Sequence, residues 1–238
     1  MKKRKPPIST IYQRLYDAWG PQGWWPGRTR LEVMVGAVLT QNTAWVNVEQ
    51  AIRRLKREKA LTLQRLHEVQ TGTLAEWIRP AGYYNLKARR LKNLVEFVMT
   101  RFGGRLNRMA GEETDALRGL LLEVNGIGRE TADCIVLYAF SKPRFVVDAY
   151  TRRFLLRHDW IGGEEDYDEV AGLFMDGLDR DPAVFNEYHA LIVELGKRHC
   201  KTKPECHDCP LACYPYTENV DLRSSLFDHH PSKTPLDE

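Results

Sequence analysis

The sequence lacks any apolar run long enough to cross a lipid bilayer. Its basic start, MKKRKPP, is not followed by a hydrophobic stretch, so the pattern of a secretory signal is also missing. A large excess of one charge is absent too, since the formal net charge is only +3. With 43% hydrophobic and 28% charged residues, the composition is typical of a globular protein and not of a disordered chain. We therefore expect a protein without membrane association, folded into one large domain or two small ones.

The small net charge is unevenly distributed along the chain. Residues 214–238 are acidic, so the rest of the chain is more basic than the total indicates. Basic residues gather at positions 2–5, 53–57, 87–92 and 101–108. Such clusters suit a phosphate backbone, although a basic helix face is more often simply solvated. The charge pattern permits a nucleic acid partner without establishing one.

Hydrophobic residues follow a helical period in almost every long segment. Residues 31–39 form one apolar stripe, and Thr43 is the expected N-cap of a helix that ends at residue 57. Only residues 144–147 look extended, and they are too few for a sheet. The predicted fold class is all-α, without internal repeats and with a polar tail over residues 214–238. Further helices are predicted at residues 86–102, 114–124, 132–139, 150–158, 167–178 and 181–197.

A glycine-containing turn lies between two of these predicted helices, where residues 124–132 read VNGIGRETA. Gly126 and Gly128 allow positive φ and a tight hairpin, and they leave the backbone uncovered. The N–H groups that follow can hold a phosphate at a helix N-terminus without reading the base sequence. An ordinary helix–helix turn is an equally good reading of this motif alone.

An aspartate follows two valines twenty residues after the hairpin. Asp148, in the segment VVDAYT, can cap the next helix by accepting an N–H of its first turn. A carboxylate in such a half-apolar setting could also stabilise an oxocarbenium-like transition state next to a sugar and orient a water molecule. The two roles are compatible, because the bonds of a cap would hold the carboxylate in place for chemistry.

The order of these features resembles the helix-hairpin-helix-Gly-Pro-Asp superfamily of DNA glycosylases. Two more segments, LTQNT at 39–43 and GYYNLKA at 82–88, are similar to its endonuclease III branch. The resemblance covers roughly residues 20–213. It implies a six-helix barrel at 29–142 and a helical iron–sulfur domain formed by 1–28 with 143–213. It also implies a base-excision enzyme, and we expect a monomer of bacterial or archaeal type in the cytoplasm, near the nucleoid.

Site residues follow from the positions that match the family motifs. Asp148 falls at the catalytic aspartate. Gln41 and Tyr83 fall where the family inserts side chains into the gap left by the extruded nucleotide of double-stranded DNA. Gln41 could instead end a helix, and Tyr83 could be a packed surface ring. The phosphate-binding hairpin consists of Asn125, Gly126, Ile127, Gly128 and Arg129.

Cysteines are concentrated near the end of the chain. Four of the five lie within fourteen residues, and such clustering favours a metal site in a reducing compartment over a disulfide framework. The endonuclease III branch implies a [4Fe–4S] cluster here, although the first and last spacers of this chain are shorter than the family's. Structural zinc, with His199 and His207 as spare ligands, is the alternative. The expected ligands are Cys200, Cys206, Cys209 and Cys213.

One residue of the hairpin bears on the type of reaction. Bifunctional members of the branch have a lysine where this chain has Glu130, and a carboxylate cannot form the Schiff base through which that lysine cleaves the strand. We therefore expect a monofunctional enzyme that leaves an abasic site. Glu130 itself is expected to be an exposed residue of the first helical turn.

Aromatic residues give the expectation for the damaged base. Trp24, Trp25 and Trp45 resemble the base pocket of the bacterial 3-methyladenine glycosylase subgroup, in which rings sandwich a cationic N-alkylated purine. Each tryptophan could instead fill space between the domains. Glycosylases for uracil, mismatched thymine or adenine, a bifunctional enzyme, and a helix-hairpin-helix module without catalysis are the other possibilities.

Overall fold

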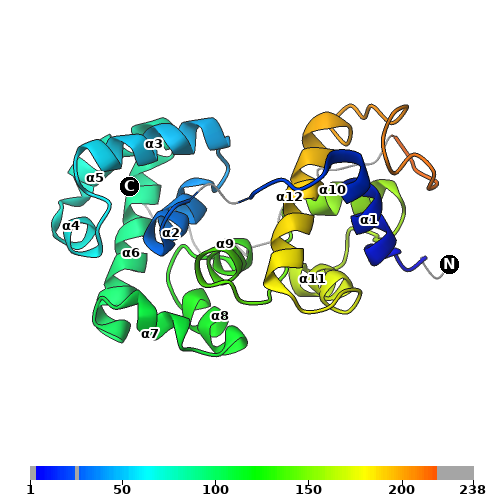
Figure 1. Cartoon of the computed structure of the whole chain (residues 1–238). Helices are drawn as coiled ribbons and strands as arrows, with labels where there is room; N and C mark the ends of the chain where they lie inside the picture. Colours follow the sequence, from blue (N-terminus) through cyan, green and yellow to red (C-terminus); the bar gives the residue numbers. More distant parts are fainter. Residues whose placement is uncertain (1–3, 25–26, 219–238) are drawn as a thin grey trace. The chain divides into compact units, whose positions relative to one another are not determined.

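The computed structural model describes residues 4–24 and 27–218 (Figure 1). Within these residues it has twelve α-helices, one short 3₁₀-helix and one π-helix, and it has no strand. The all-α prediction is therefore confirmed. None of the helices in this described part is long and apolar enough to cross a membrane.

The chain divides into two compact units, in agreement with the prediction of two domains. The central unit comprises Gly23–Val146 and Arg180–Asn186, and the terminal unit comprises Met1–Gln22, Val147–Asp179 and Glu187–Glu238. The division thus falls after Val146, a few residues later than the domain limit expected at residue 142. The first residues of the last helix group with the central unit, which periodicity alone does not show.

Ten helical segments make up the central unit up to Val146. They are α2 (Arg30–Leu39), α3 (Trp45–Arg57), α4 (Leu63–Glu68), α5 (Thr71–Trp77), η1 (Arg79–Ala81), α6 (Tyr84–Phe102), α7 (Leu106–Ala110), α8 (Thr114–Leu122), α9 (Arg129–Cys134) and the π-helix η2 (Ile135–Ala139). The remaining helices are α1 (Ile8–Trp19), α10 (Ala149–Arg157), α11 (Tyr167–Met175) and α12 (Pro182–Arg198).

Helix α2 lies at the centre of the core of its unit. Its residues from Leu31 to Leu39 are all buried, and it contacts α3, α6, α9 and η2. A helix enclosed on every side needs partners for its few polar groups. Buried Glu32 accordingly accepts from Lys56 Nζ at 2.6 Å, and the Thr29 side chain caps the helix by accepting from Glu32 N.

The predicted N-cap of α3 is wrong. The N-cap position is Ala44, which has no side chain to accept a hydrogen bond. The Thr43 hydroxyl instead donates to the carbonyl oxygen of Ala81 at 2.6 Å and accepts from Lys87. Thr43 is therefore engaged by groups far away in the sequence, and these compete successfully with local capping.

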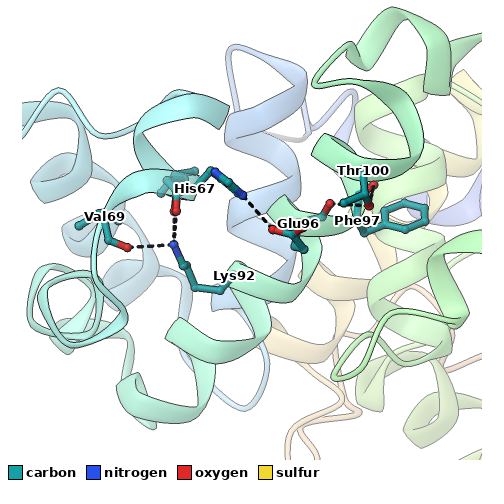
Figure 2. A network of polar contacts seen from close by, with 7 residues as sticks. His67, Val69, Lys92, Glu96, Phe97 and Thr100 are labelled. Atoms are coloured by element: carbon teal, nitrogen blue, oxygen red, sulfur yellow. Dashed lines mark hydrogen bonds and ion pairs between the residues drawn. The ribbon is translucent and has the colours of Figure 1, made fainter.

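Helix α6, with 19 residues, is the longest of the helices in the described ranges, and it supports the helices around it. Figure 2 shows one side of α6, where the Lys92 ammonium donates to the carbonyl oxygens of Val69 at 2.9 Å and of His67. One turn further on, Glu96 Oε2 lies 2.8 Å from His67 Nε2. The Lys92 contacts satisfy carbonyl groups at the C-terminal end of α4, which would otherwise have no partner within that helix.

The pair α8 and α9 forms the expected helix-hairpin-helix. Asp133 of α9 is fully buried and accepts from Arg118 Nε of α8 at 2.6 Å, while Arg144 Nε lies 3.5 Å away. After Cys134 the chain widens into the π-helix, where a regular α-helix over residues 132–139 was predicted. Ile135, Val136 and Leu137 are all buried, so this segment is enclosed and is not an amphipathic stripe.

The terminal unit has an aromatic core. Phe174 packs against Tyr188 and Phe154 with ring centroids 5.4 and 6.5 Å apart. Residues 214–217, which were expected in the polar tail, lie against α10, where Thr217 N donates to the Arg157 carbonyl at 2.7 Å. Residues 219–238 of that tail lie outside the described residues.

Candidate active site and DNA-binding residues

Asp148 is the N-cap of α10, as one of its two predicted roles requires. Its Oδ1 accepts from the Thr151 backbone N–H at 2.8 Å and from the Thr151 hydroxyl at 2.9 Å. Its Oδ2 lies 3.5 Å from Nε2 of His189 on α12. With only 13% of its side chain exposed, the carboxylate is fixed in one orientation with one oxygen committed to the helix.

The surroundings of Asp148 keep it ionised. Burial by itself raises the pKa of this carboxyl, but the adjacent His189 and the two hydrogen bonds from Thr151 lower it by more. The net result is a pKa below the ordinary aspartate value of 3.8. At neutral pH the site therefore holds a buried, oriented negative charge, which can stabilise a positive charge developing on a sugar ring.

Of the two residues that contact Asp148, Thr151 could be predicted from the sequence and His189 could not. Thr151 follows Asp148 by three residues, which is the spacing of an N-cap and its N3 position, so this contact could have been found. His189 is 6% exposed and lies 41 positions further along the chain on a largely apolar helix face. Sequence analysis missed His189, because only the fold brings it to the carboxylate.

The hairpin between α8 and α9 has only one glycine with positive φ. Gly126 has φ +92°, whereas Gly128 has φ −91° and serves as the N-cap of α9. Buried Ile127 anchors the turn by donating its N–H to the Val124 carbonyl at 3.0 Å. Of the two glycines that allow positive φ, only Gly126 uses it, since ordinary backbone angles suffice at Gly128. Asn125 and Arg129 flank the turn, exposed and half-buried respectively.

Gln41 lies against the hairpin. Its Nε2 donates to the Gly126 carbonyl at 3.1 Å and to the Thr131 hydroxyl at 2.9 Å, and its Oε1 accepts from Arg90 Nη1. Gln41 therefore does more than end α2, because it links the loop after that helix to the hairpin. Tyr83, at the start of α6, has a left-handed backbone and is 71% exposed, so it is not a packed surface ring.

The tryptophans assigned to the base pocket are only partly described. Trp45 is half-buried at the start of α3, and its Nε1 donates to Glu49 at 3.0 Å. Trp24 is also half-buried, whereas Trp25 lies outside the described residues. Glu130 is exposed in the first turn of α9, as expected.

The cysteine cluster lies in the terminal unit. Cys200, Cys206 and Cys209 line a small cavity of about 20 Å³, and Cys213 is exposed. Arg157 donates to Cys200 Sγ at 3.1 Å. Burial, followed by neighbouring thiols, raises the pKa of Cys209 to about 11.

These thiols do not form a ligand set as they stand. No three His, Cys, Asp or Glu side chains converge on one point within residues 4–24 and 27–218. The donor chemistry fits a thiolate-bound cluster, since three sulfurs and a cationic side chain share one cavity.

Comparison with known proteins places these features in one family. Residues 35–180 match the HhH-GPD superfamily of base excision DNA repair proteins. A protein of Methanocaldococcus jannaschii described as a DNA repair glycosylase is 48% identical over 206 residues, which cover 86% of this chain and 93% of that protein. An endonuclease III of Sulfolobus acidocaldarius is 28% identical and matches 82% of this chain and 86% of its own length.

Solved structures agree with this assignment. The H. pylori 3-methyladenine DNA glycosylase bound to 1,N6-ethenoadenine has a TM-score of 0.70 and 30% identity, covering 79% of this chain and 96% of that one. An endonuclease III–DNA complex has a TM-score of 0.77 and 24% identity, covering 90% and 96%. At this lower identity the second likeness shows the fold alone.

Proposed function

The chain belongs to the HhH-GPD superfamily of base excision DNA repair proteins and is a DNA glycosylase, and from this we propose a monofunctional enzyme that releases an N-alkylated purine such as 3-methyladenine. The observation that carries the proposal is the ionised, oriented carboxylate of Asp148, one oxygen of which is held by Thr151. The substrate class and the absence of strand cleavage rest on Trp24, Trp45 and Glu130.

Asp148 can promote loss of the base without a metal ion. As the bond between C1′ and the base nitrogen breaks, its electron pair leaves with the base and positive charge develops on the sugar. The carboxylate stabilises this charge, and a water molecule adds to C1′ and gives up one proton. An N-alkylated purine is already cationic, so it leaves as a neutral base and needs no strong acid. The product is an abasic site in an otherwise intact strand.

The proposed lack of strand cleavage depends on Glu130. This residue is exposed in the first turn of α9, at the position where bifunctional members of the branch carry their nucleophilic lysine. A carboxylate cannot form a Schiff base with the sugar. Hydrolysis therefore ends at the abasic site, and a strand break appears only after alkali treatment.

The proposed substrate depends on aromatic surfaces near the start of the central unit. A cationic, electron-poor purine is attracted to the face of an indole ring, and a neutral base gains less from the same contact. Half-buried Trp24 and Trp45 are candidates for this role. A protein of similar fold and 30% identity, the H. pylori enzyme, is a 3-methyladenine DNA glycosylase.

We further propose a structural [4Fe–4S] cluster on Cys200, Cys206, Cys209 and Cys213. When bound, it would hold the segment after α12 together and would take no part in base excision. Double-stranded DNA with a damaged base is the partner, and the protein acts as a monomer in the cytoplasm.

A panel of duplexes tests this function. Each carries one 3-methyladenine, one uracil or one thymine glycol, and free base and strand breaks are measured before and after alkali. Release of the alkylated base, with breaks only after alkali, is the expected result. Breaks without alkali would contradict the monofunctional proposal, and release of uracil or thymine glycol alone would contradict the substrate class.

A further inference from the structure

Helix α6 carries a row of hydrogen-bond donors that reach three separate loops. Lys87, Arg90 and Asn93 are spaced three residues apart, so each is a neighbour of the next on the helix surface and the row winds around the helix. The three loops are the ones that hold Gln41, Tyr83 and the hairpin. All these contacts lie within the central unit.

Lys87 connects the loop of Gln41 with the turn before Tyr83. It is 1% exposed, and its ammonium donates to the carbonyl oxygens of Leu39 at 2.8 Å and Ala81 at 2.7 Å and to the Thr43 hydroxyl at 2.6 Å. All three N–H groups are thereby used. A buried cation needs all of its acceptors in place, so the three hydrogen bonds tie the two loops to α6 and to each other.

Arg90 connects Gln41 with the hairpin. Its guanidinium donates to Gln41 Oε1, which leaves the Gln41 amide nitrogen to donate to the Gly126 carbonyl. The stem of Arg90 runs directly beneath the hairpin, because a Cβ on Gly126 would lie only 2.3 Å from Arg90 Cγ. Arg90 therefore sets the direction of the Gln41 side chain and limits how closely the Gly126 turn approaches α6.

Asn93 completes the row at the far side of the hairpin. Its Nδ2 donates to the Asn125 carbonyl at 3.0 Å, and its side chain is exposed. Its contribution to the row is this hydrogen bond to the turn.

We propose that Lys87, Arg90 and Asn93 form a positioning row for base extrusion, with Arg90 as its central member. The row fixes Gln41, Tyr83 and the hairpin relative to one another before DNA binds. This inference rests on the proposed function, because it takes Gln41 and Tyr83 as the residues that fill the gap left by the nucleotide. A pre-arranged set of loops avoids the entropic penalty of ordering them while the base leaves the stack.

Arg90→Met is the central test, and Arg101→Met is the matched control. Both remove one positive charge from α6, but Arg101 is exposed in the last turn, far along the helix from the three loops. For Arg90→Met we expect the single-turnover rate of 3-methyladenine release at saturating enzyme to fall about tenfold, the loss typical of a charged hydrogen bond. Affinity for an undamaged duplex of the same length should match that of Arg101→Met within about twofold, because the Arg90 guanidinium donates to Gln41 and the proposed role is not a phosphate contact.

Three results would overturn the positioning role. These are an unchanged rate at saturation, equal rates for the two variants, or a loss confined to duplex affinity, which would make Arg90 a backbone contact. If Arg90→Met does not fold, Asn93→Ala removes an exposed member of the row and should lower the same rate by a smaller factor. An unchanged rate in a folded Asn93→Ala protein would then count against the row.

Hydrogen exchange of the free protein separates this inference from the proposed function. Arg90→Met should accelerate amide exchange at residues 41–43 and 126–131, whereas Arg101→Met should leave these segments unchanged. If the wild type releases no base from any duplex but this local acceleration is observed, only the proposed function fails. If exchange is unaffected in an active enzyme, the positioning row is refuted while the function stands.

Discussion

The two glycines of the hairpin should respond very differently to alanine. An alanine at position 126 has to adopt φ +92° and places its Cβ 2.3 Å from Arg90 Cγ and 3.0 Å from Arg90 Cδ. An alanine at position 128 keeps φ −91° and meets nothing within 4 Å. The pair therefore compares a strained site with an open one in the same turn.

The expected loss for Gly126→Ala is the sum of two effects. A positive φ lowers the free energy of unfolding by about 1–2 kcal/mol for an alanine. Displacing Arg90 weakens or breaks its charged hydrogen bond to Gln41, which contributes roughly 1.5–3 kcal/mol. We expect the free energy of unfolding to fall by about 3 kcal/mol, because part of the Arg90 stem can move. Gly128→Ala loses only N-cap preference and should cost below about 1 kcal/mol.

Urea unfolding followed by circular dichroism at neutral pH measures both losses. Duplex affinity adds a second comparison, since a methyl group at position 128 would stand where the backbone is proposed to meet a phosphate. Gly128→Ala should therefore bind undamaged DNA more weakly although it remains stable. Equal destabilisation by the two substitutions, or full stability of Gly126→Ala, would refute the account of how Arg90 supports the hairpin.

Three further predictions concern other parts of the molecule. The pKa of Asp148 is lowered in the folded protein, so the folded state binds fewer protons at this site than the unfolded state does. The stability that its charge contributes is therefore fully present above the unfolded pKa of about 4. This stability is lost as the pH falls through the lower pKa of the folded state. Urea unfolding at pH 7, 4 and 3 should therefore show a difference between wild type and Asp148→Asn that shrinks only at the acid end. Tyr83→Ala should leave the free energy of unfolding within about 0.5 kcal/mol, since the ring is exposed, yet it should slow base release; a parallel loss of stability would show that the ring packs in the fold. Metal analysis of anaerobically purified protein should find iron with acid-labile sulfide, and Cys209→Ala should lower both; zinc without iron would support the alternative site.

Helix positions could be predicted where apolar residues recur at the helical spacing. The apolar stripe of residues 31–39 corresponds to α2, and the pattern at residues 86–102 corresponds to α6 from Tyr84 onward. Periodicity works here because these helices bury continuous rows of side chains. The same spacing at residues 132–139 gave no sign of the widened turn after Cys134, because it does not distinguish a π-helix from an α-helix.

Individual side-chain roles could be predicted only where the partner is close in sequence. Asp148 as an N-cap is such a case, since Thr151 follows three residues later. Thr43 was assigned to a cap for the same local reason, but Lys87 and the Ala81 carbonyl engage it instead. Lys87 itself gave no signal beyond its place in a family segment, because an isolated lysine in a sequence is ordinarily solvated.

The histidine partner of the proposed catalytic residue was likewise beyond sequence reasoning. His189 reaches Asp148 from another helix, and its neighbours on α12 are mainly apolar. A lone histidine in such a pattern carries no indication of a carboxylate partner. Contacts of this kind depend on how helices pack, and periodicity does not encode that packing.

Single-turnover release of 3-methyladenine by wild type and Asp148→Asn tests the central claim most directly. Asparagine keeps the size of the side chain and an oxygen that can accept from Thr151, so the N-cap survives while the negative charge is lost. The account predicts that the variant binds the duplex as tightly as the wild type but releases the base at least a hundredfold more slowly, as expected when a group that stabilises transition-state charge is removed. Equal rates of release in a folded, DNA-binding variant would show that Asp148 serves the helix alone and would contradict the assignment.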